Sequence, residues 1–221
     1  MHIEKNSNHI ETKIEELFNI YKEFEKSIKT TLSGFADVSK EDFFYELCYC
    51  LLTPATQAKH AEAVVQYLKE NNFFEKGYDP RDILRGKVFK DKKIYIRFHN
   101  QKASRLLLAR KNWKVVANIL ESSIPINEKR EELVKFTKGL GYKEASHFLR
   151  NIGYKGLAVL DRHILRNMVD FGLLSSVPNV GSRKNYLYVE QLFLDFALSI
   201  GFEPEVLDLL LWAKETGYVG K

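Results

Sequence analysis

A lysine and an aspartate that lie close together in the sequence have the chemistry to act on one substrate. Lys143 follows the turn sequence Gly139-Leu-Gly141, and Asp161 follows the apolar segment Ala158-Val-Leu160. An uncharged amine is a nucleophile, and a carboxylate stabilises positive charge that develops beside it. An amine and a carboxylate presented in this way can do chemistry together.

Both residues are predicted to lie at helix starts. Lys143 lies about 200° around its helix from the buried stripe, so its amine should point away from the core. Asp161 precedes another helical run and can cap it. Gly139 and Gly141 suit a sharp turn whose backbone takes conformations closed to other residues. The apolar residues after the turn recur at the spacing of one helix face: Ala145, Phe148, Leu149 and Ile152.

Each of these features also has an ordinary structural interpretation. Many helical hairpins turn on glycine for steric reasons alone, most helix lysines are simply exposed, and an aspartate before a helix can be only a cap. A Gly-x-Gly hairpin, however, presents backbone N–H groups and the positive end of the next helix to one anion. The combination of hairpin, lysine and aspartate favours a phosphate-binding hairpin with a functional lysine beside it.

These motifs resemble a known family. The sequence Gly139–Gly153, followed by Leu160–Arg166, resembles the helix-hairpin-helix DNA glycosylase superfamily and, more narrowly, the type-2 (archaeal-type) 8-oxoguanine DNA glycosylase/AP lyases. The segment Glu46–Thr53 and the tail Leu207–Lys221 are similar to the same family. The resemblance extends from about residue 40 to residue 221, and residues 70–130 match only loosely.

The resemblance implies a bifunctional DNA repair enzyme. Lys143 would attack C1′ of a damaged nucleotide, expel the base and form a Schiff base with the opened sugar, and elimination would then nick the strand 3′ to the lesion. Asp161 would be its acidic partner, stabilising positive charge on the sugar as the base departs. The expected substrate is 8-oxoguanine in double-stranded DNA. The resemblance implies that the reaction needs no cofactor.

The resemblance also suggests which residues hold the base. Phe98 and Trp212 would sandwich the flipped base, although Trp212 follows three leucines and could simply be core. Asp208, a backbone carbonyl or the carboxylate of Lys221 could accept the extra N7–H of 8-oxoguanine. The residues expected to bind DNA phosphates are Lys138, the Gly139 and Gly141 amides, Arg183 and Lys184.

One segment departs from the family pattern. The family carries Leu-Thr-Ala-Asn after the helix that contains the cysteines, whereas this chain has Thr-Pro-Ala-Thr-Gln at residues 53–57. If that asparagine fills the gap left by the flipped base or reads the opposite base, its role is vacant or has passed to Gln57. Gln57 is therefore a predicted strand wedge, and the opposite-base preference is open.

The remaining sequence predicts an all-α fold. Apolar residues recur at helical spacing along the chain, and no strand, repeat or low-complexity tract is expected. Following the superfamily, residues 36–155 would form a helical lobe that carries the hairpin. Residues 1–35 and 156–221 would form the second lobe, with a DNA-binding cleft between the two. Ser39 and Asn127 are predicted to cap helices.

The distribution of charge indicates a nucleic-acid partner. The net charge of +5 is modest, but ten Lys and Arg residues and a single acid, Asp91, lie in the range Arg85–Lys111. Such a run can be only a solvated face. Here Tyr95, Phe98 and Trp113 are interleaved with the basic residues, a pattern that favours a polyanion with stackable bases.

Composition argues against several other classes of protein. No run reaches the roughly 18 apolar residues of a membrane span, and the polar N-terminus does not read as a signal peptide, so a cytoplasmic, DNA-associated protein is expected. Cys48 and Cys50 lie on different faces of an apolar helix, which predicts buried thiols rather than a disulfide or metal site. The scattered histidines predict no metal site. No feature indicates an oligomer, so a monomer is expected.

Two other functions stay open. Lys143 and Asp161 would equally suit a glycosylase/lyase for oxidised pyrimidines or abasic sites, and only a panel of lesions separates these substrates. A non-catalytic helix-hairpin-helix DNA-binding module would use the hairpin without chemistry. That module predicts no activity and no effect of Lys143→Gln beyond slightly weaker binding.

Overall fold

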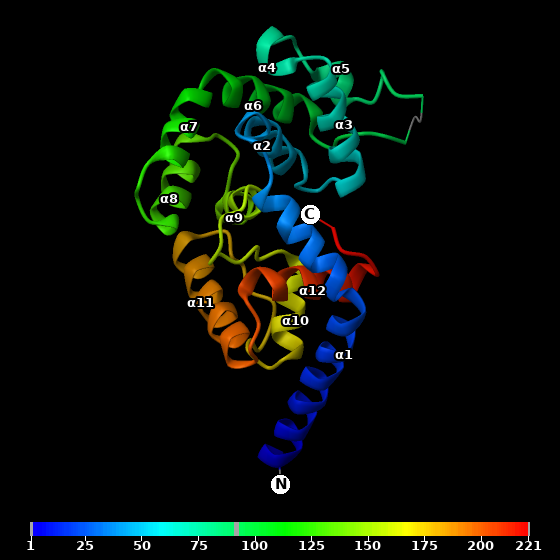
Figure 1. Ribbon diagram of the computed structural model, residues 1–221, viewed down its shortest axis with the longest axis vertical. Coiled ribbons are helices and arrows are strands. Elements are labelled where there is room, and N and C mark those ends of the chain that lie inside the picture. The colour runs from blue at the N-terminus through cyan, green and yellow to red at the C-terminus, as the bar shows by residue number, and fades with distance from the viewer. Residues whose placement is uncertain (1, 91–92, 221) are drawn as a thin grey trace. The chain divides into compact units, whose positions relative to one another are not determined.

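The chain is helical throughout its described parts. The computed structural model describes residues 2–90 and 93–220, and every regular element in these ranges is a helix (Figure 1). The all-α prediction is confirmed. The elements are α1 (His2–Ala36), the 3₁₀ helix η1 (Lys40–Asp42), α2 (Phe43–Leu52), α3 (Ala58–Glu70), α4 (Phe73–Lys76), α5 (Arg81–Leu84), α6 (His99–Lys111), α7 (Trp113–Glu121), α8 (Ile126–Phe136), α9 (Tyr142–Asn151), α10 (Arg162–Asp170), α11 (Arg183–Ser199) and α12 (Pro204–Thr216).

Two compact units divide the chain. The first unit contains the chain up to Asp37 and the chain from Leu149 onward, and the second unit is Val38–Phe148. Each unit has buried hydrophobic residues of its own. The first carries α1, α10, α11 and α12, and the second carries α2 to α8 with most of α9.

In the first unit, α12 is the central helix. It contacts α1, α10 and α11 (Figure 1), and because it is covered on several sides, most of its residues are buried. From α1, Leu17 and Ile28 are completely buried. The rings of Phe18 and Tyr21 also lie 4.9 and 5.0 Å from the ring of Phe202, between centroids. Apolar contacts thus pack the first helix, α1, against Phe202 and the last helix, α12.

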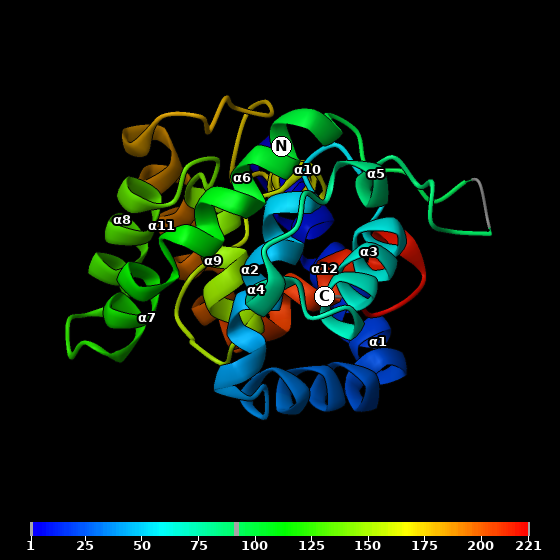
Figure 2. The same cartoon turned by 90° about the horizontal axis from the view of Figure 1, so that it is seen from above.

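In the second unit, α2 takes the central place. Eight of its ten residues are buried, and it contacts both α3 and α6 (Figure 2), which explains why its sequence is apolar on nearly every face. Cys48 and Cys50 lie inside this core, as predicted, and no disulfide joins them. Burial raises the pKa of the Cys48 thiol well above its usual value, which keeps that thiol protonated and unreactive.

Two predicted helix caps are wrong. Ser39 precedes η1, and its side chain makes no capping hydrogen bond. α8 begins at Ile126, directly after Pro125, so Asn127 lies inside the helix instead of before it. Proline has a fixed φ and no N–H to satisfy, which suits the start of a helix. The helix therefore begins two residues earlier than a cap at Asn127 predicts.

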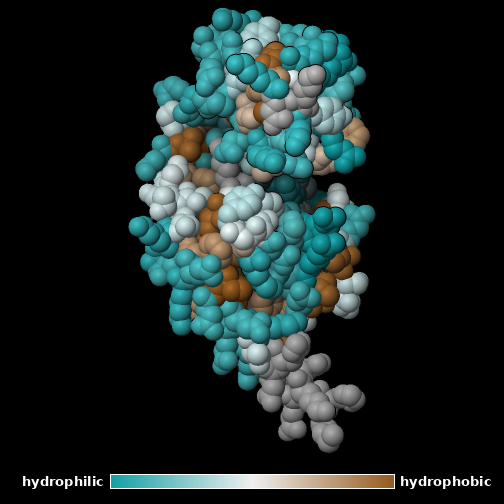
Figure 3. Space-filling model, turned by 90° about the vertical axis from the view of Figure 1, so that its right-hand side faces the viewer, coloured by the Kyte–Doolittle hydropathy of each residue, from teal (hydrophilic) through white to brown (hydrophobic). Residues whose placement is uncertain are grey.

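The side chains on one face of the molecule are mainly hydrophilic (Figure 3). Hydrophobic side chains on that face form small, separate patches. No helix in the described ranges is long and apolar enough to cross a membrane.

Candidate active site

The hairpin between α8 and α9 turns on a glycine in the left-handed region. The Leu140 N–H donates to the Thr137 carbonyl at 3.1 Å and closes the turn. Gly139 has a φ of +94°, and a Cβ added there would lie 2.4 Å from Cδ of Arg105. Both the backbone conformation and the close approach of Arg105 require glycine. The prediction is confirmed for Gly139.

Gly141 has a different role from the predicted one. It is not among the glycines with positive φ, so the expectation that its backbone needs a glycine-only conformation is wrong. Its N–H donates to Oε2 of Glu144 at 3.3 Å, and its carbonyl accepts from the Ala145 N–H at 2.9 Å. This is the arrangement in which an acidic side chain in the first turn closes on the N-terminus of its own helix. A phosphate bound to the Gly141 amide would have to displace Glu144.

Lys143 is the second residue of α9 and is partly exposed. The apolar residues predicted to face the core are all buried, three of them in this helix and Ile152 directly after it. The residues around Lys143 are fixed to α8, because the Tyr142 hydroxyl donates to the Glu131 carboxylate and the buried Arg130 donates to Oγ of Ser146 at 3.0 Å. The backbone that carries the Lys143 amine is therefore rigid, as a positioned nucleophile requires.

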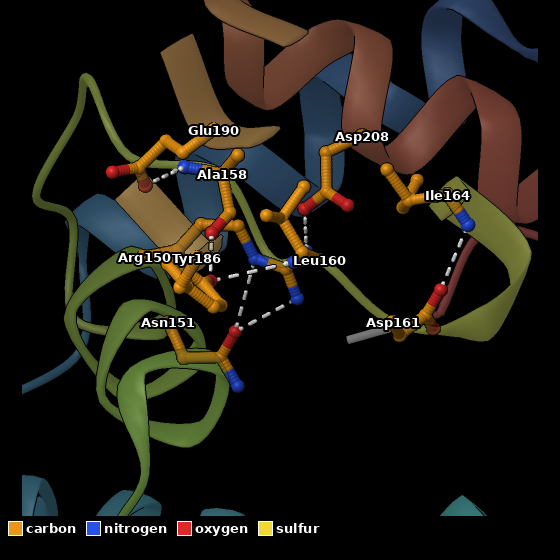
Figure 4. Close-up of polar contacts among 9 residues, drawn as sticks. All are labelled: Arg150, Asn151, Ala158, Leu160, Asp161, Ile164, Tyr186, Glu190 and Asp208. Carbon is orange, nitrogen blue, oxygen red and sulfur yellow. Dashed lines mark hydrogen bonds and ion pairs between the residues drawn. The ribbon is translucent and has the colours of Figure 1, made fainter. Parts of the chain in front are cut away.

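Asp161 caps α10, as predicted (Figure 4). Its Oδ1 accepts from the His163 N–H at 2.8 Å and from the Ile164 N–H at 2.9 Å. The positive end of the helix dipole favours a negative charge at this position. Both capping bonds end on Oδ1, so Oδ2 lies outside the cap and can act on another group.

The segment that leads to Asp161 is held by α11. Residues 157–160 are buried, so their backbone groups need partners within the protein. The Ala158 N–H donates to Oε1 of Glu190 at 3.0 Å, and the Ala158 carbonyl accepts from the Tyr186 hydroxyl at 2.7 Å (Figure 4). The N–H of the residue before Asp161 donates to the same hydroxyl at 3.4 Å. These bonds fix the position from which the carboxylate is presented.

A buried ion pair joins Arg150 of α9 to Asp208 of α12 within the first unit (Figure 4). Both side chains are almost fully buried, at 6% and 5% exposure. Arg150 also donates from Nε and from Nη2 to Oδ1 of Asn151 at 3.3 and 3.1 Å, and its guanidinium carbon lies 5.3 Å from the Phe35 ring centroid. Asp208 is therefore engaged with Arg150, and its role as an acceptor for the base stays a prediction.

Removing the Asp208 carboxylate should destabilise the protein strongly. Asp208→Ala leaves Arg150 buried without its ion-pair partner, and breaking a buried pair from one side costs about 3–5 kcal/mol. Urea unfolding measures this loss. Glu203→Ala is the matched control, because Glu203 is an exposed carboxylate before the same helix and makes no capping bond; it should change the unfolding free energy by less than about 0.5 kcal/mol. A loss below about 1 kcal/mol for Asp208→Ala would contradict the importance of the pair.

The two aromatic residues predicted to sandwich a base belong to different units. Phe98 precedes the first residue of α6 with a φ of +58°, and its side chain is 59% exposed. An exposed aromatic residue in the left-handed region is typical of functional sites. Trp212 is half-buried, and the His163 ring meets its ring edge-on at 5.2 Å between centroids. The base-stacking role of both residues stays a prediction.

The other residues predicted to contact DNA are exposed where they are described. Lys138 lies in the hairpin, and Arg183 and Lys184 form the first turn of α11. Gln57 is exposed and directly precedes α3. Lys221 lies outside the described residues. The phosphate-binding and wedge roles of these residues stay predictions.

Two residues of the basic stretch are packed into the protein in a way that the charge pattern of the sequence did not predict. Arg105 lies against Gly139 in the hairpin, and its Nε is buried without a hydrogen-bond partner within residues 2–90 and 93–220. Lys102 is only 1% exposed. The sequence does carry a signal for the burial of Lys102. This residue precedes the buried Leu106 and Ala109 by four and seven residues, a spacing that places all three on one helix face.

The sequence matches one family model and curated proteins of the same description. The family model described as 8-oxoguanine DNA glycosylase matches residues 14–202. A protein from Methanocaldococcus jannaschii named 8-oxoguanine DNA glycosylase/AP lyase is 38% identical over 213 residues, covering 95% of this chain and 98% of that protein. A protein of the same name from Fusobacterium nucleatum is 33% identical over 216 residues, covering 93% of this chain and 96% of the relative.

Solved structures agree with the sequence comparison. The 8-oxoguanine DNA glycosylase of Thermotoga maritima superposes with a TM-score of 0.83 at 32% identity, covering 96% of this chain and 100% of that chain. The M. jannaschii 8-oxoguanine glycosylase/lyase in complex with a 15-mer DNA containing 8-oxoguanine superposes with a TM-score of 0.82 at 33% identity. That match covers 95% of this chain and 100% of the other.

Proposed function

The chain belongs to the 8-oxoguanine DNA glycosylase family, and from this membership we propose that it excises 8-oxoguanine from duplex DNA and then nicks the strand 3′ to the lesion. The enzyme is thus both a DNA N-glycosylase and an AP lyase of base-excision repair.

The observation that carries the proposal is the placement of Lys143. It lies two residues after Gly141, on the exposed side of a helix whose first turn is fixed to α8. The hairpin before it combines a left-handed glycine with the guanidinium of Arg105. A hairpin of this kind binds the DNA backbone without reading sequence. An amine next to a bound phosphate is within reach of the neighbouring sugar.

The proposed reaction begins at the sugar of the flipped nucleotide. The lone pair of the uncharged Lys143 amine attacks C1′, and the bond between C1′ and the base breaks, with its electron pair leaving on the base. Asp161 stabilises the positive charge that develops on the sugar. Opening of the sugar ring gives a Schiff base between C1′ and the lysine. Loss of a proton from C2′ then expels the 3′ phosphate, which nicks the strand.

The remaining assignments concern binding. Phe98 and Trp212 stack on the flipped base, and Asp208 and Lys221 contribute to its recognition. The phosphate-binding set is Lys138, Gly139, Gly141, Arg183 and Lys184, with Gln57 as the strand wedge. Residues 36–155 and residues 1–35 with 156–221 act as the two DNA-binding lobes. The protein works in the cytoplasm as a monomer and needs no cofactor.

A panel of lesions tests the proposed substrate. Duplexes carrying 8-oxoguanine, an oxidised pyrimidine or an abasic site, each opposite cytosine, are incubated with excess enzyme, and base release and strand cleavage are measured separately. We expect release of 8-oxoguanine followed by cleavage. Cleavage of the abasic duplex with no release of 8-oxoguanine would keep the lyase and reject the substrate. Release of the oxidised pyrimidine alone would establish the alternative glycosylase.

A further inference from the structure

One hydroxyl of α11 is bonded to the backbone on both sides of Val159. The Tyr186 hydroxyl donates to the Ala158 carbonyl at 2.7 Å and accepts from the Leu160 N–H at 3.4 Å (Figure 4). All of these residues are buried. The two backbone groups therefore cannot reach water unless the segment moves, and each depends on a partner within the protein.

The same segment ends in a tight turn directly before Asp161. The Asp161 N–H donates to the Val159 carbonyl at 2.7 Å, which closes a γ-turn of three residues with Leu160 in the middle. Leu160 is not among the residues with positive φ, so the turn is of the inverse type. A single hydrogen bond does not offset the entropy lost by ordering three residues. The direction in which the Asp161 side chain leaves the backbone thus depends on contacts from outside the turn.

Glu190 holds this segment from one helical turn further along α11. Its Oε1 accepts from the Ala158 N–H at 3.0 Å (Figure 4), and its side chain is buried. Residues four positions apart in a helix lie on the same face, so Tyr186 and Glu190 meet the segment together. These two residues are called the Tyr186–Glu190 pair. The pair bonds both backbone groups of Ala158 and the N–H of Leu160.

The carboxylate of Asp161 is thus fixed from two sides within the first unit. The capping bonds orient its Oδ1 relative to α10, and the Tyr186–Glu190 pair orients the backbone from which it projects. A phenyl ring would fill the same space in the core as the ring of Tyr186. Packing therefore does not explain the hydroxyl, whereas its bonds to the segment before Asp161 do.

We propose that the Tyr186–Glu190 pair positions Asp161 for the departure of the base, so that loss of its bonds slows base release more than cleavage at an existing abasic site. The inference rests on the proposed function, because it concerns the step in which positive charge develops on the sugar as the base leaves. That step is absent where the base has already been lost. A displacement of about 1 Å at a reacting group costs up to about 10²-fold in rate. Tyr186 and Glu190 are thus positioning residues that act through Asp161.

The test compares two rates. Single-turnover release of 8-oxoguanine from a duplex with cytosine opposite the lesion gives the first rate, and cleavage of the matched duplex with an abasic site gives the second. We expect Tyr186→Phe to lower the first rate about 10- to 100-fold and the second by less than about threefold. Added to Asp161→Asn, the same substitution should lower base release by less than about threefold further, because both changes act through one carboxylate.

Glu190 provides a second variant, which carries the test if Tyr186→Phe does not fold. Glu190→Met removes the acceptor at similar volume and should lower the ratio of base release to abasic cleavage about fivefold or more. Glu190→Gln retains an oxygen that accepts from the Ala158 N–H and should keep that ratio within about threefold of the wild-type value. Equal losses in these two variants would show that the bond is not the cause and would overturn the inference.

Tyr45→Phe is the matched control. Tyr45 is also a buried tyrosine whose hydroxyl accepts from a backbone N–H, that of Phe74, at 3.4 Å, but it belongs to the second unit. This variant should lose thermal stability and keep the wild-type ratio of the two rates. A fall in the ratio as large as that of Tyr186→Phe would show that general destabilisation is the cause and would overturn the inference.

Further outcomes separate this inference from the proposed function. Equal falls in both rates for Tyr186→Phe, or losses that multiply in the double variant with Asp161→Asn, would overturn the inference and leave the proposed function intact. If the wild-type protein releases an oxidised pyrimidine in place of 8-oxoguanine, the proposed substrate fails and the ratio is read from that duplex. Cleavage of abasic DNA without release of any base would overturn both.

Discussion

Lys143→Gln is expected to abolish covalent trapping and to lower strand cleavage by at least about 10³-fold, because removal of a nucleophile eliminates the bond-forming step. Glutamine resembles lysine in length and flexibility but its amide nitrogen is not nucleophilic. Since Lys143 is partly exposed and points away from the buried stripe of α9, the free energy of unfolding should change by less than about 0.5 kcal/mol. The measurement is borohydride reduction during reaction with a duplex carrying 8-oxoguanine opposite cytosine, followed by denaturing electrophoresis.

Lys135→Gln provides the control for the loss of one positive charge near the hairpin. Lys135 is an exposed lysine near the end of α8, and its variant should still be trapped on the DNA. An adduct that persists in Lys143→Gln would place the Schiff base on another amine and contradict the mechanism. A wild-type protein that forms no adduct with either 8-oxoguanine or abasic DNA would support the non-catalytic DNA-binding module instead.

Asp161→Asn is expected to separate the charge of this residue from its structural role. Asparagine caps helices about as well as aspartate, so its Oδ1 can keep the bonds to His163 and Ile164 and stability should change by only a few tenths of a kcal/mol. The negative charge is lost, and with it the stabilisation of the developing cation, so the rate of base release should fall roughly 10²- to 10³-fold. Single-turnover kinetics measure the rate of base release, and thermal unfolding of the same preparation measures the change in stability.

Two further variants complete this comparison. Asp161→Ala loses both the charge and the cap, so it should match the asparagine variant in rate and lose about 1 kcal/mol more stability. Ser182→Ala removes the cap of α11, because the Oγ of Ser182 accepts from the Asn185 N–H at 3.2 Å. This variant should lose about 1 kcal/mol of stability without a change in the rate of base release. If Asp161→Asn keeps the wild-type rate within about threefold, the residue is only a cap and the catalytic assignment is wrong.

The local parts of the site were predictable from the sequence. The apolar spacing after Gly139, the exposed side of the helix that carries Lys143 and the capping position of Asp161 all depend on residues within a few positions of one another. Such signals survive in a single sequence because helix periodicity and capping are short-range effects. The family resemblance draws on this stretch together with Glu46–Thr53 and the tail Leu207–Lys221, and the stretch itself carries the two residues of the predicted chemistry.

Elements without periodicity escaped the sequence analysis. α4 has only four residues and begins after Asn72, whose φ is +55°. It is held in place by Arg110, whose Nη2 donates to the Glu75 carbonyl at 2.8 Å. A single helical turn has too few residues to show a stripe, and its partner lies 35 positions away. Tertiary contacts determine whether and where such short helices form.

The sequence by itself therefore determined that the protein is helical, that a glycine hairpin presents Lys143, and that Asp161 starts a helix. The tertiary structure alone decided that Lys102 donates to the Pro54 carbonyl, that Asp208 pairs with Arg150, and that α11 fixes the segment before Asp161. These contacts join residues 32 to 58 positions apart. They follow from burial, because a polar group removed from water must find its partner wherever the fold brings one near.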